Sequence, residues 1–286
     1  MFATHDGVFH SDDVMAAAIL MEVAPVTTFI RTRDPAELAE VGLCFDVAGG
    51  QYDHHQLGGN GTRPNGIPYA SAGLLWRDYG ARVCGGNAEI AAEVDRQLIA
   101  PIDAHDNGMV LSIPAHADVR APTVSHLISD FNPSWDEPQD FDRLFFEAVT
   151  FAAGILNRAI VRARGVVLAR SEVRQAVADA IDPRVVVLPF FVPWQEALCA
   201  ASDAALLIVY PSAGTWRVQV VPITPGQPGA RLPLPAAWAG LDGDTLATLT
   251  GVADAAFAHR GRFIAGAQSR DGALALARLA LEEPTP

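Results

Sequence analysis

Hydrophobic and polar residues alternate in short blocks over the first 50 positions. Apolar runs at 1–7, 26–34 and 43–50 fit strands, and the blocks between them, 12–24 and 35–41, have the spacing of helices. In the first helical block the apolar residues recur at intervals of three and four: Val14, Ala17, Ala18 and Met21. This β-α-β-α-β order predicts a parallel sheet covered by helices.

The middle of the chain reads as mainly helical. Helices are predicted over 69–80, which ends in a glycine, and over 87–99, followed by a turn at 101–108. After a stretch interrupted by prolines, a long apolar stripe begins at Phe141 and continues towards Ala180. We interpret this stripe as a helix that connects two domains.

Short β-rich runs with turn residues between them follow Pro183, and a helix closes the chain. The predicted fold class is therefore α/β, with an N-terminal doubly wound, mostly parallel sheet, a long connecting helix and a smaller α+β C-terminal domain. The predicted boundaries are 1–138, 139–182 and 183–286.

Composition excludes several functions. The net charge of -13 argues against a surface that coats nucleic acid, although a local polyanion site remains compatible with it. All 20 basic residues are arginine, so Schiff-base lysine catalysis and a P-loop lysine are excluded. The three cysteines suggest neither disulfides nor a thiolate zinc site. Without an apolar run of about 20 residues, we expect a cytoplasmic protein that does not bind membranes.

Residues that can bind metals gather after the predicted strands, where ligands bind to open parallel sheets. Seven of the eight histidines lie in the first 126 residues. The clustered residues are His5, Asp6, His10, Asp12, Asp13, Asp46, Asp53, His54, His55, Asp103, His105 and Asp106. If the topology is as predicted, four separate segments converge on one edge of the sheet.

Imidazoles and carboxylates without cysteine suit Mn²⁺, Fe²⁺ or Zn²⁺ in a catalytic site. Two ions roughly 3.5 to 4 Å apart can activate water and stabilise a phosphoryl group in transfer. Asp46 is the candidate that would bridge them. Each residue also has a simpler interpretation: Ser11 or Asp12 could cap the first helix, Asp106 could belong to an Asp-Asn-Gly turn, and Asp53 could orient a neighbouring histidine.

Five motifs occur in an order that resembles the DHH phosphoesterase superfamily. They are "THDGVFHSDDVMA", "YDHHQ", "GIPYASAGLLWRDYG", "IDAHDNG" and "FAHRGRFIAGAQSRDGALALA". Together they resemble most closely the metal-dependent hydrolase family related to the melanocyte-proliferating-gene-one protein. The resemblance extends from residue 1 to the last helix.

This resemblance implies two divalent cations, usually Mn²⁺ with Mg²⁺, Fe²⁺ or Zn²⁺ as alternatives, and phosphoester hydrolysis, including 3'-to-5' exonuclease action on RNA or DNA. The implied ligands of one ion are His5, His10 and Asp46, and those of the other are Asp12, Asp46, His54 and Asp106. His55 would face the substrate, and we expect Asp53 to tune His55 or His54 by hydrogen bonding. His10 replaces an aspartate common in the superfamily, and Asp13 is the alternative ligand.

In the second domain the resemblance implies substrate binding by His259, Arg262, Gly266 and Arg270, with Ala265 where relatives have a glycine. Leu57 stands where relatives are often basic, and Arg63 is a candidate to compensate. Two rival functions stay open: hydrolysis of a small phosphate ester, pyrophosphate or cyclic dinucleotide, and metal-dependent binding without catalysis. The alanine-rich stripe of the connecting helix fits either an internal core or a homodimer.

Overall fold

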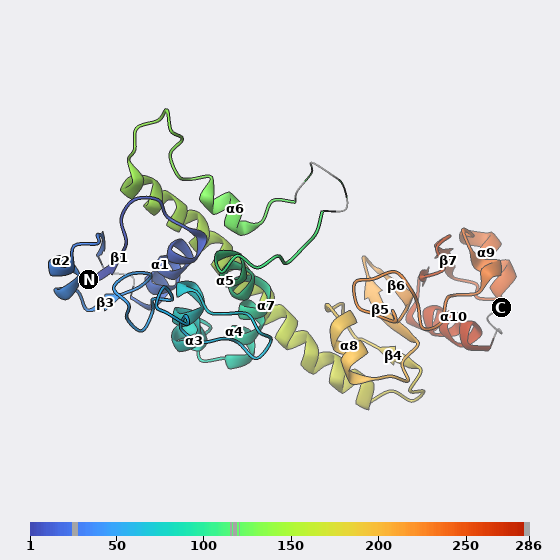
Figure 1. The fold of residues 1–286 in the computed structure, drawn as a ribbon. Helices are drawn as coiled ribbons and strands as arrows, with labels where there is room; N and C mark the ends of the chain where they lie inside the picture. The colour runs from blue at the N-terminus through green and yellow to red at the C-terminus, as the bar shows by residue number, and fades with distance from the viewer. Residues whose placement is uncertain (25–27, 115, 117–118, 120, 283–286) are drawn as a thin grey trace. The chain divides into compact units, whose positions relative to one another are not determined.

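The computed structural model describes residues 1–24, 28–114, 116, 119 and 121–282. The chain forms two compact units, Met1–Arg164 and Gly165–Pro286 (Figure 1). The predicted domain boundaries stay a prediction.

The first unit contains a parallel sheet, as predicted. Its strands β1 (Phe2–Thr4), β2 (Phe29–Arg31) and β3 (Leu43–Cys44) are arranged in the order β2-β1-β3, with Phe2 opposite both Phe29 and Leu43. The strands are shorter than the apolar runs that predicted them. The central strand β1 ends directly before His5, so the loop after it starts at the sheet's carboxyl edge.

Helices form most of the rest of this unit. They are α1 (Ser11–Val23), α2 (Pro35–Ala39), α3 (Ser71–Val83), α4 (Ala88–Val94), a π-helical turn (Asp95–Ile99), α5 (Ala100–Asp106) and α6 (Val124–Ser129). Helix α1 packs against α3, and both are buried over most of their length. The small side chains at 16–18 are fully buried and let the two helices approach closely.

The start of α1 differs from the prediction. Neither Ser11 nor Asp12 caps the helix, because the N-cap residue is His10. The Asp13 carboxylate accepts hydrogen bonds from the backbone N–H of His10 (2.9 Å) and Val14 (2.8 Å). Since Asp13 satisfies this end of the helix, the Asp12 carboxylate is free to face the interior.

The predicted turn at 101–108 is wrong for its first six residues. Helix α5 continues through Pro101 to Asp106, and only Asn107 and Gly108 turn away. Proline has no N–H to donate within a helix, and here the wider π-helical turn stands directly before it. Asp106 therefore lies at the end of a helix and not after a strand.

The long connecting helix is present as α7 (Phe141–Ala178). By length and composition alone it could cross a membrane, and 28% of its most apolar stretch is buried. A core helix of a soluble protein meets the same criterion. The expected cytoplasmic location and lack of membrane binding stay predictions.

The second unit is the α+β domain that the sequence predicts. Its mixed sheet has the order β4-β5-β6-β8-β7, with only β4 and β5 parallel. The strands are β4 (Val185–Val187), β5 (Leu207–Ser212), β6 (Thr215–Val220), β7 (Ala255–Ala258) and β8 (Ile264–Ala267). The helices are α8 (Gln195–Ala201), α9 (Gly243–Thr250), α10 (Arg270–Glu282) and a 3₁₀ turn (Ala236–Trp238).

Two apolar cores cover the two faces of this sheet. Successive residues of β5 alternate between them, because side chains of a strand point to opposite faces. Val209 packs with Leu276 of α10, whereas Ile208 packs with Leu198 of α8 and Val173 of α7.

Candidate functional site

Four segments of the first unit meet around the imidazole of His54. Its Nε2 atom lies 3.2 Å from Asp46 Oδ1, 3.2 Å from Asp106 Oδ2 and 3.5 Å from Asp12 Oδ2. Asp46 follows β3, Asp12 lies on α1 and Asp106 ends α5. The structure thus brings together the four residues that the sequence assigned to one ion.

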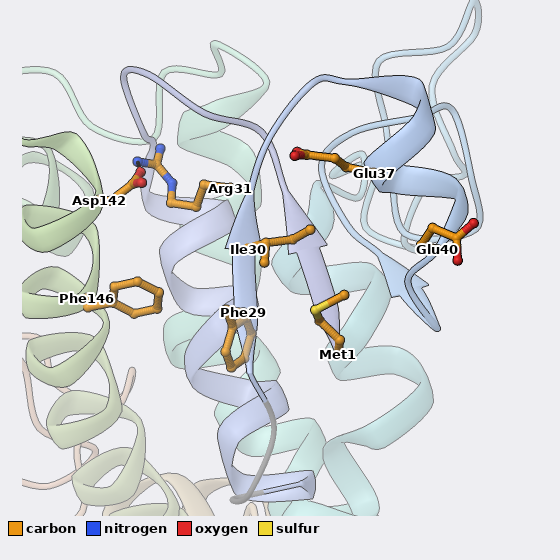
Figure 2. A pocket seen from close by; sticks show the side chains of 8 residues that line it. All are labelled: Met1, Phe29, Ile30, Arg31, Glu37, Glu40, Asp142 and Phe146. Carbon is orange, nitrogen blue, oxygen red and sulfur yellow. Dashed lines mark hydrogen bonds and ion pairs between the residues drawn. The ribbon is translucent and has the colours of Figure 1, made fainter.

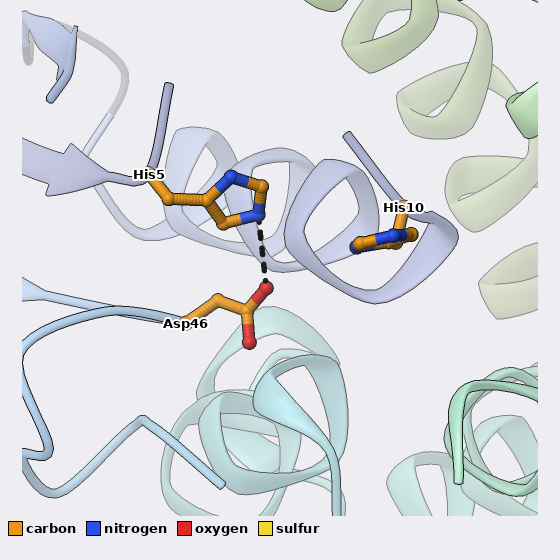
Figure 3. A group of neighbouring side chains, drawn as sticks. All are labelled: His5, His10 and Asp46. Carbon is orange, nitrogen blue, oxygen red and sulfur yellow. Dashed lines mark ion pairs between the residues drawn. The ribbon is translucent and has the colours of Figure 1, made fainter. Parts of the chain in front are cut away.

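A second group of side chains shares Asp46. The Nε2 atom of His5 lies 3.3 Å from Asp46 Oδ2 (Figure 3). The same atom lies 3.2 Å from Asp13 Oδ2. The His10 ring lies 5.9 Å from the His5 ring between centroids, and candidate ligand atoms of His5, His10 and Asp46 are within 4.8 Å of one another. His10 also forms such a group with Asp12 and Asp106. Both His10 and Asp13 therefore lie at the site.

Local contacts fix the orientation of His5 and Asp46. His5 Nδ1 lies 3.0 Å from the Asp6 carbonyl oxygen, which can only accept, so Nδ1 carries a proton and Nε2 faces the carboxylates. Asp46 has a left-handed backbone conformation with φ of 54°, which aspartate tolerates better than most residues, and its N–H donates to the Tyr52 carbonyl oxygen (3.0 Å). These contacts hold the Asp46 carboxylate between the two histidines.

Burial and mutual repulsion shift the pKa values of the cluster. Burial, together with the charges of Asp46 and Asp106, raises the pKa of Asp12 well above its ordinary value. Burial opposes both ionisation of Asp46 and protonation of His5, but the contacts between the groups outweigh it. His5 and His54 hold the pKa of Asp46 below its ordinary value, and Asp13 and Asp46 raise the pKa of His5 to about 10. A positively charged group or ion among these carboxylates is therefore strongly favoured.

Several buried carboxylate oxygens have no hydrogen-bond partner among the described residues. They are Asp12 Oδ1, Asp13 Oδ2 and Asp46 Oδ2. A neutral imidazole donates only one hydrogen bond, so His54 Nε2 cannot satisfy the three carboxylates around it. Unsatisfied buried anions are costly, and a divalent cation would remove this cost. The residues present fit a divalent-cation site with oxygen and nitrogen ligands.

His55 and Asp53 form a pair at the edge of this cluster. His55 Nδ1 lies 2.9 Å from Asp53 Oδ1, and the side chain of His55 is 61% exposed. Asp53 also accepts hydrogen bonds from the backbone N–H groups of Gly49 (2.7 Å) and His55 (3.0 Å). Asp53 therefore orients His55 through Nδ1, which also lies 3.4 Å from Asp46 Oδ1. The role of His55 towards a substrate stays a prediction.

Arg63 has contacts that give it a structural role. Its buried guanidinium bonds to Asp103 Oδ2 (2.7 Å) and to both oxygens of Asp95, and it lies 4.4 Å from the centre of the Tyr69 ring. Asp103 in turn accepts a hydrogen bond from the N–H of Gly73 in α3 (3.0 Å). These contacts offer no support for the predicted role of Arg63 in substrate binding.

The predicted substrate residues of the second unit gather around β8. His259 is exposed, and its ring lies 4.5 Å from the Phe263 ring between centroids at a tilt of 52°. Arg262 donates to the Leu234 carbonyl oxygen (2.7 Å). A Cβ at Gly266 would lie 2.7 Å from both Arg217 and Phe257, so this position requires glycine. Arg270 is exposed at the start of α10. Their roles in substrate binding stay predictions.

A cavity of about 540 Å³ lies beside β2, apart from the His54 cluster (Figure 2). Its polar wall includes Arg31, which forms an ion pair with Asp142 of α7 (3.0 Å) and donates to the Gly7 carbonyl oxygen (2.7 Å). None of the residues predicted to bind metal or substrate lines this cavity.

Sequence reasoning gave no role to Ser71, the first residue of α3, which is fully buried against the cluster. Its Oγ donates to Asp46 Oδ1 (3.0 Å) and its N–H donates to Asp12 Oδ2 (3.2 Å). Ser71 lies near the start of the helix predicted over 69–80, and nothing in the sequence assigned it a partner. No local pattern reveals partners 25 and 59 residues away.

Comparison with known proteins gives matches over almost the whole chain. A family model described as MYG1_exonuc, uncharacterised protein family (UPF0160), matches residues 1–281. The chain is 32% identical to the MYG1 exonuclease of Rattus norvegicus, over 99% of this chain and 84% of the relative. It is 30% identical to the MYG1 exonuclease of Homo sapiens, over 98% of this chain and 85% of the relative.

Two solved structures are similar at low identity. One is a pGpG-specific phosphodiesterase, PggH from Vibrio, with a TM-score of 0.32, 11% identity and coverage of 99% of both chains. The other is RecJ from Thermus thermophilus in complex with Mg²⁺, with a TM-score of 0.31, 13% identity, and coverage of 100% of this chain and 50% of that one.

Proposed function

Because the chain belongs to the MYG1_exonuc family (UPF0160), we propose that it is a divalent-metal-dependent phosphoester hydrolase. Its proposed substrates are nucleotide or oligonucleotide phosphodiesters, with the 3'-to-5' exonuclease action expected from the resemblance. The relatives named exonuclease support this proposal. The observation that carries it is the cluster of three carboxylates around His54 Nε2, which leaves buried oxygens without partners among the described residues.

The chain offers two sets of ligands that share Asp46. One set would be Asp12, Asp46, His54 and Asp106, and the other His5 and Asp46 with His10 or Asp13. When bound, a pair of divalent cations supplies water of lowered pKa and neutralises charge on the phosphoryl oxygens. Manganese is the metal we expect first.

His55 is the residue that would contact the substrate. Asp53 accepts from its Nδ1 and so fixes the ring, which leaves Nε2 pointing away from that contact. When the ring carries a proton on both nitrogens, Nε2–H would donate to an oxygen of the phosphoester or pass its proton to the leaving oxygen, which leaves the ring neutral with Nδ1–H still bonded to Asp53. Asp53 acts through His55, in the way that carboxylates orient catalytic histidines in other enzymes.

The acidic character of the chain favours short substrates. A net charge of -13 and the absence of lysine leave little positive charge for a long polynucleotide. We therefore expect activity on short single-stranded oligonucleotides to exceed activity on long duplexes.

Purified protein loaded with Mn²⁺ should hydrolyse a chromogenic phosphodiester and shorten 5'-labelled single-stranded oligonucleotides from their 3' ends, and chelation with EDTA should stop both reactions. Cyclic dinucleotides and pyrophosphate, assayed in parallel, test the rival substrates. If protein that has bound Mn²⁺ hydrolyses none of these substrates, only the non-catalytic binding function remains.

Mn²⁺ should also stabilise the folded protein against heat. A ligand at 100 times its dissociation constant adds about 2.7 kcal/mol to the free energy of unfolding. Because Asp12 and His5 have raised pKa values, protons compete with the metal for these groups, and the gain should increase from about pH 6 to about pH 8. Differential scanning calorimetry with and without Mn²⁺ measures this effect. A melting temperature independent of Mn²⁺ at both pH values would contradict it.

A further inference from the structure

One residue touches both carboxylates that the two ligand sets need most, one through its side chain and the other through its backbone. Ser71 is fully buried, and its hydroxyl donates to Asp46 Oδ1 while its backbone N–H donates to Asp12 Oδ2. Asp12 comes from α1 and Asp46 from the loop after β3, so Ser71 links three segments that are distant in sequence.

This serine does not act as a helix cap. The N-cap residue of α3 is Ala70, and the Ser71 hydroxyl bonds across the site and not to its own helix. An ordinary helix-start serine would accept from an N–H two or three residues on. The contact with Asp46 therefore needs another explanation.

The contacts of Ser71 also fix the two carboxylate oxygens that face His54. Ser71 donates to Asp46 Oδ1 and Asp12 Oδ2, which lie 3.2 Å and 3.5 Å from His54 Nε2. The other oxygen of Asp46, Oδ2, faces His5 Nε2 at 3.3 Å. Ser71 therefore fixes the rotation of both carboxylates about the place where the two ligand sets meet. The N-terminus of α3 adds a favourable dipole beneath both anions.

We propose that Ser71 is a positioning residue that sets the Asp12 and Asp46 carboxylates in the orientation that binds the divalent cations. This inference rests on the proposed function. It assigns a role to a residue that contacts neither substrate nor metal, and it predicts that loss of the hydroxyl weakens metal binding while the fold persists.

The test measures Mn²⁺ affinity of the Ser71→Ala variant by isothermal titration calorimetry. Loss of a hydrogen bond to a metal-binding carboxylate typically costs 10- to 100-fold in metal affinity or activity, and we expect a loss of about that size. The metal-free variant should melt within a few degrees of the parent protein, and activity should recover when Mn²⁺ is raised well above the new dissociation constant. Ser71→Cys, which keeps a weaker donor, should have an affinity between the two.

The matched control is Ser125→Ala, which removes the hydroxyl of another buried serine near the start of a helix, α6. It should bind Mn²⁺ as the parent does. If the parent and Ser71→Ala bind Mn²⁺ equally well, the inference on Ser71 is overturned and the proposed function stands. If the parent itself binds no Mn²⁺, the proposed function fails and the inference fails with it.

Discussion

Replacing Asp46 with asparagine should lower the hydrolysis rate by at least about a thousandfold and weaken Mn²⁺ binding at both ligand sets. Asp46 is the shared group, since Oδ2 faces His5 at 3.3 Å and Oδ1 faces His54 at 3.2 Å. Asparagine carries no negative charge, and its NH₂ group, which can only donate hydrogen bonds, replaces one of the two carboxylate oxygens. Bound metal ions stabilise the transition state by several kcal/mol. A loss of about 4 kcal/mol of this stabilisation lowers the rate about a thousandfold.

Initial rates at saturating substrate, with Mn²⁺ affinity measured on the same preparations, check this result. Asp182→Asn is the control, because Asp182 is an aspartate of the second unit that pairs with Arg184 near the surface. It should keep full activity. Turnover by Asp46→Asn within tenfold of the parent would refute the shared role of Asp46.

Replacing Arg63 with methionine should destabilise the first unit by about 3 to 5 kcal/mol, the usual cost of breaking a buried ion pair by removing one partner. The guanidinium is the cation that offsets Asp103, which is fully buried. Burial raises the pKa of Asp103 to about 7 although Arg63 lowers it. Without Arg63 the ionised carboxylate would stand uncompensated inside the fold.

The destabilisation caused by Arg63→Met should depend on pH. The folded-state pKa of Asp103 exceeds its ordinary value, so its favourable contribution is present at low pH and is lost as the pH rises through about 7. Removing Arg63 raises that pKa further. The destabilisation should therefore be larger at about pH 8 than at about pH 5, where the carboxyl is protonated in both proteins.

Urea unfolding followed by circular dichroism measures these free energies. Arg77→Met is the matched control, because Arg77 also lies near the Tyr69 ring but is 40% exposed and pairs with the neighbouring Asp78. It should cost less than about 1 kcal/mol. The double variant Arg63→Met/Asp103→Asn should recover most of the loss at about pH 8, since asparagine still accepts from Gly73. An Arg63→Met variant as stable as the parent would contradict the structural role of Arg63.

Much of the first unit could be predicted because its signals are local. The alternation of short apolar runs with helical periodicity predicts the parallel sheet and helices α1, α3 and α7, and all of them are present. The convergence of Asp12, Asp46, His54 and Asp106 followed from motif order and from the rule that ligands bind at the carboxyl edge of a parallel sheet.

The features that sequence reasoning missed depend on contacts between distant residues. Asp106 reaches the cluster from a helix and not from a strand end, because a π-helical turn lets α5 continue through Pro101. Arg63, in a glycine-rich loop, was a candidate substrate-binding residue that could compensate for Leu57, and the sequence did not reveal that it pairs with Asp95 and Asp103. Its role in substrate binding stays a prediction. No role was predicted for Ser71, whose partners are Asp46 and Asp12. Such partners are set by tertiary packing, and no spacing rule within a segment encodes them.

The most direct test of the central claim, that these side chains hold divalent cations, is anomalous diffraction from crystals grown with Mn²⁺. The account predicts anomalous density in contact with Asp12, Asp46, His54 and Asp106, and further density beside His5. Crystals of protein that binds Mn²⁺ in solution but shows no anomalous density among these side chains would contradict it.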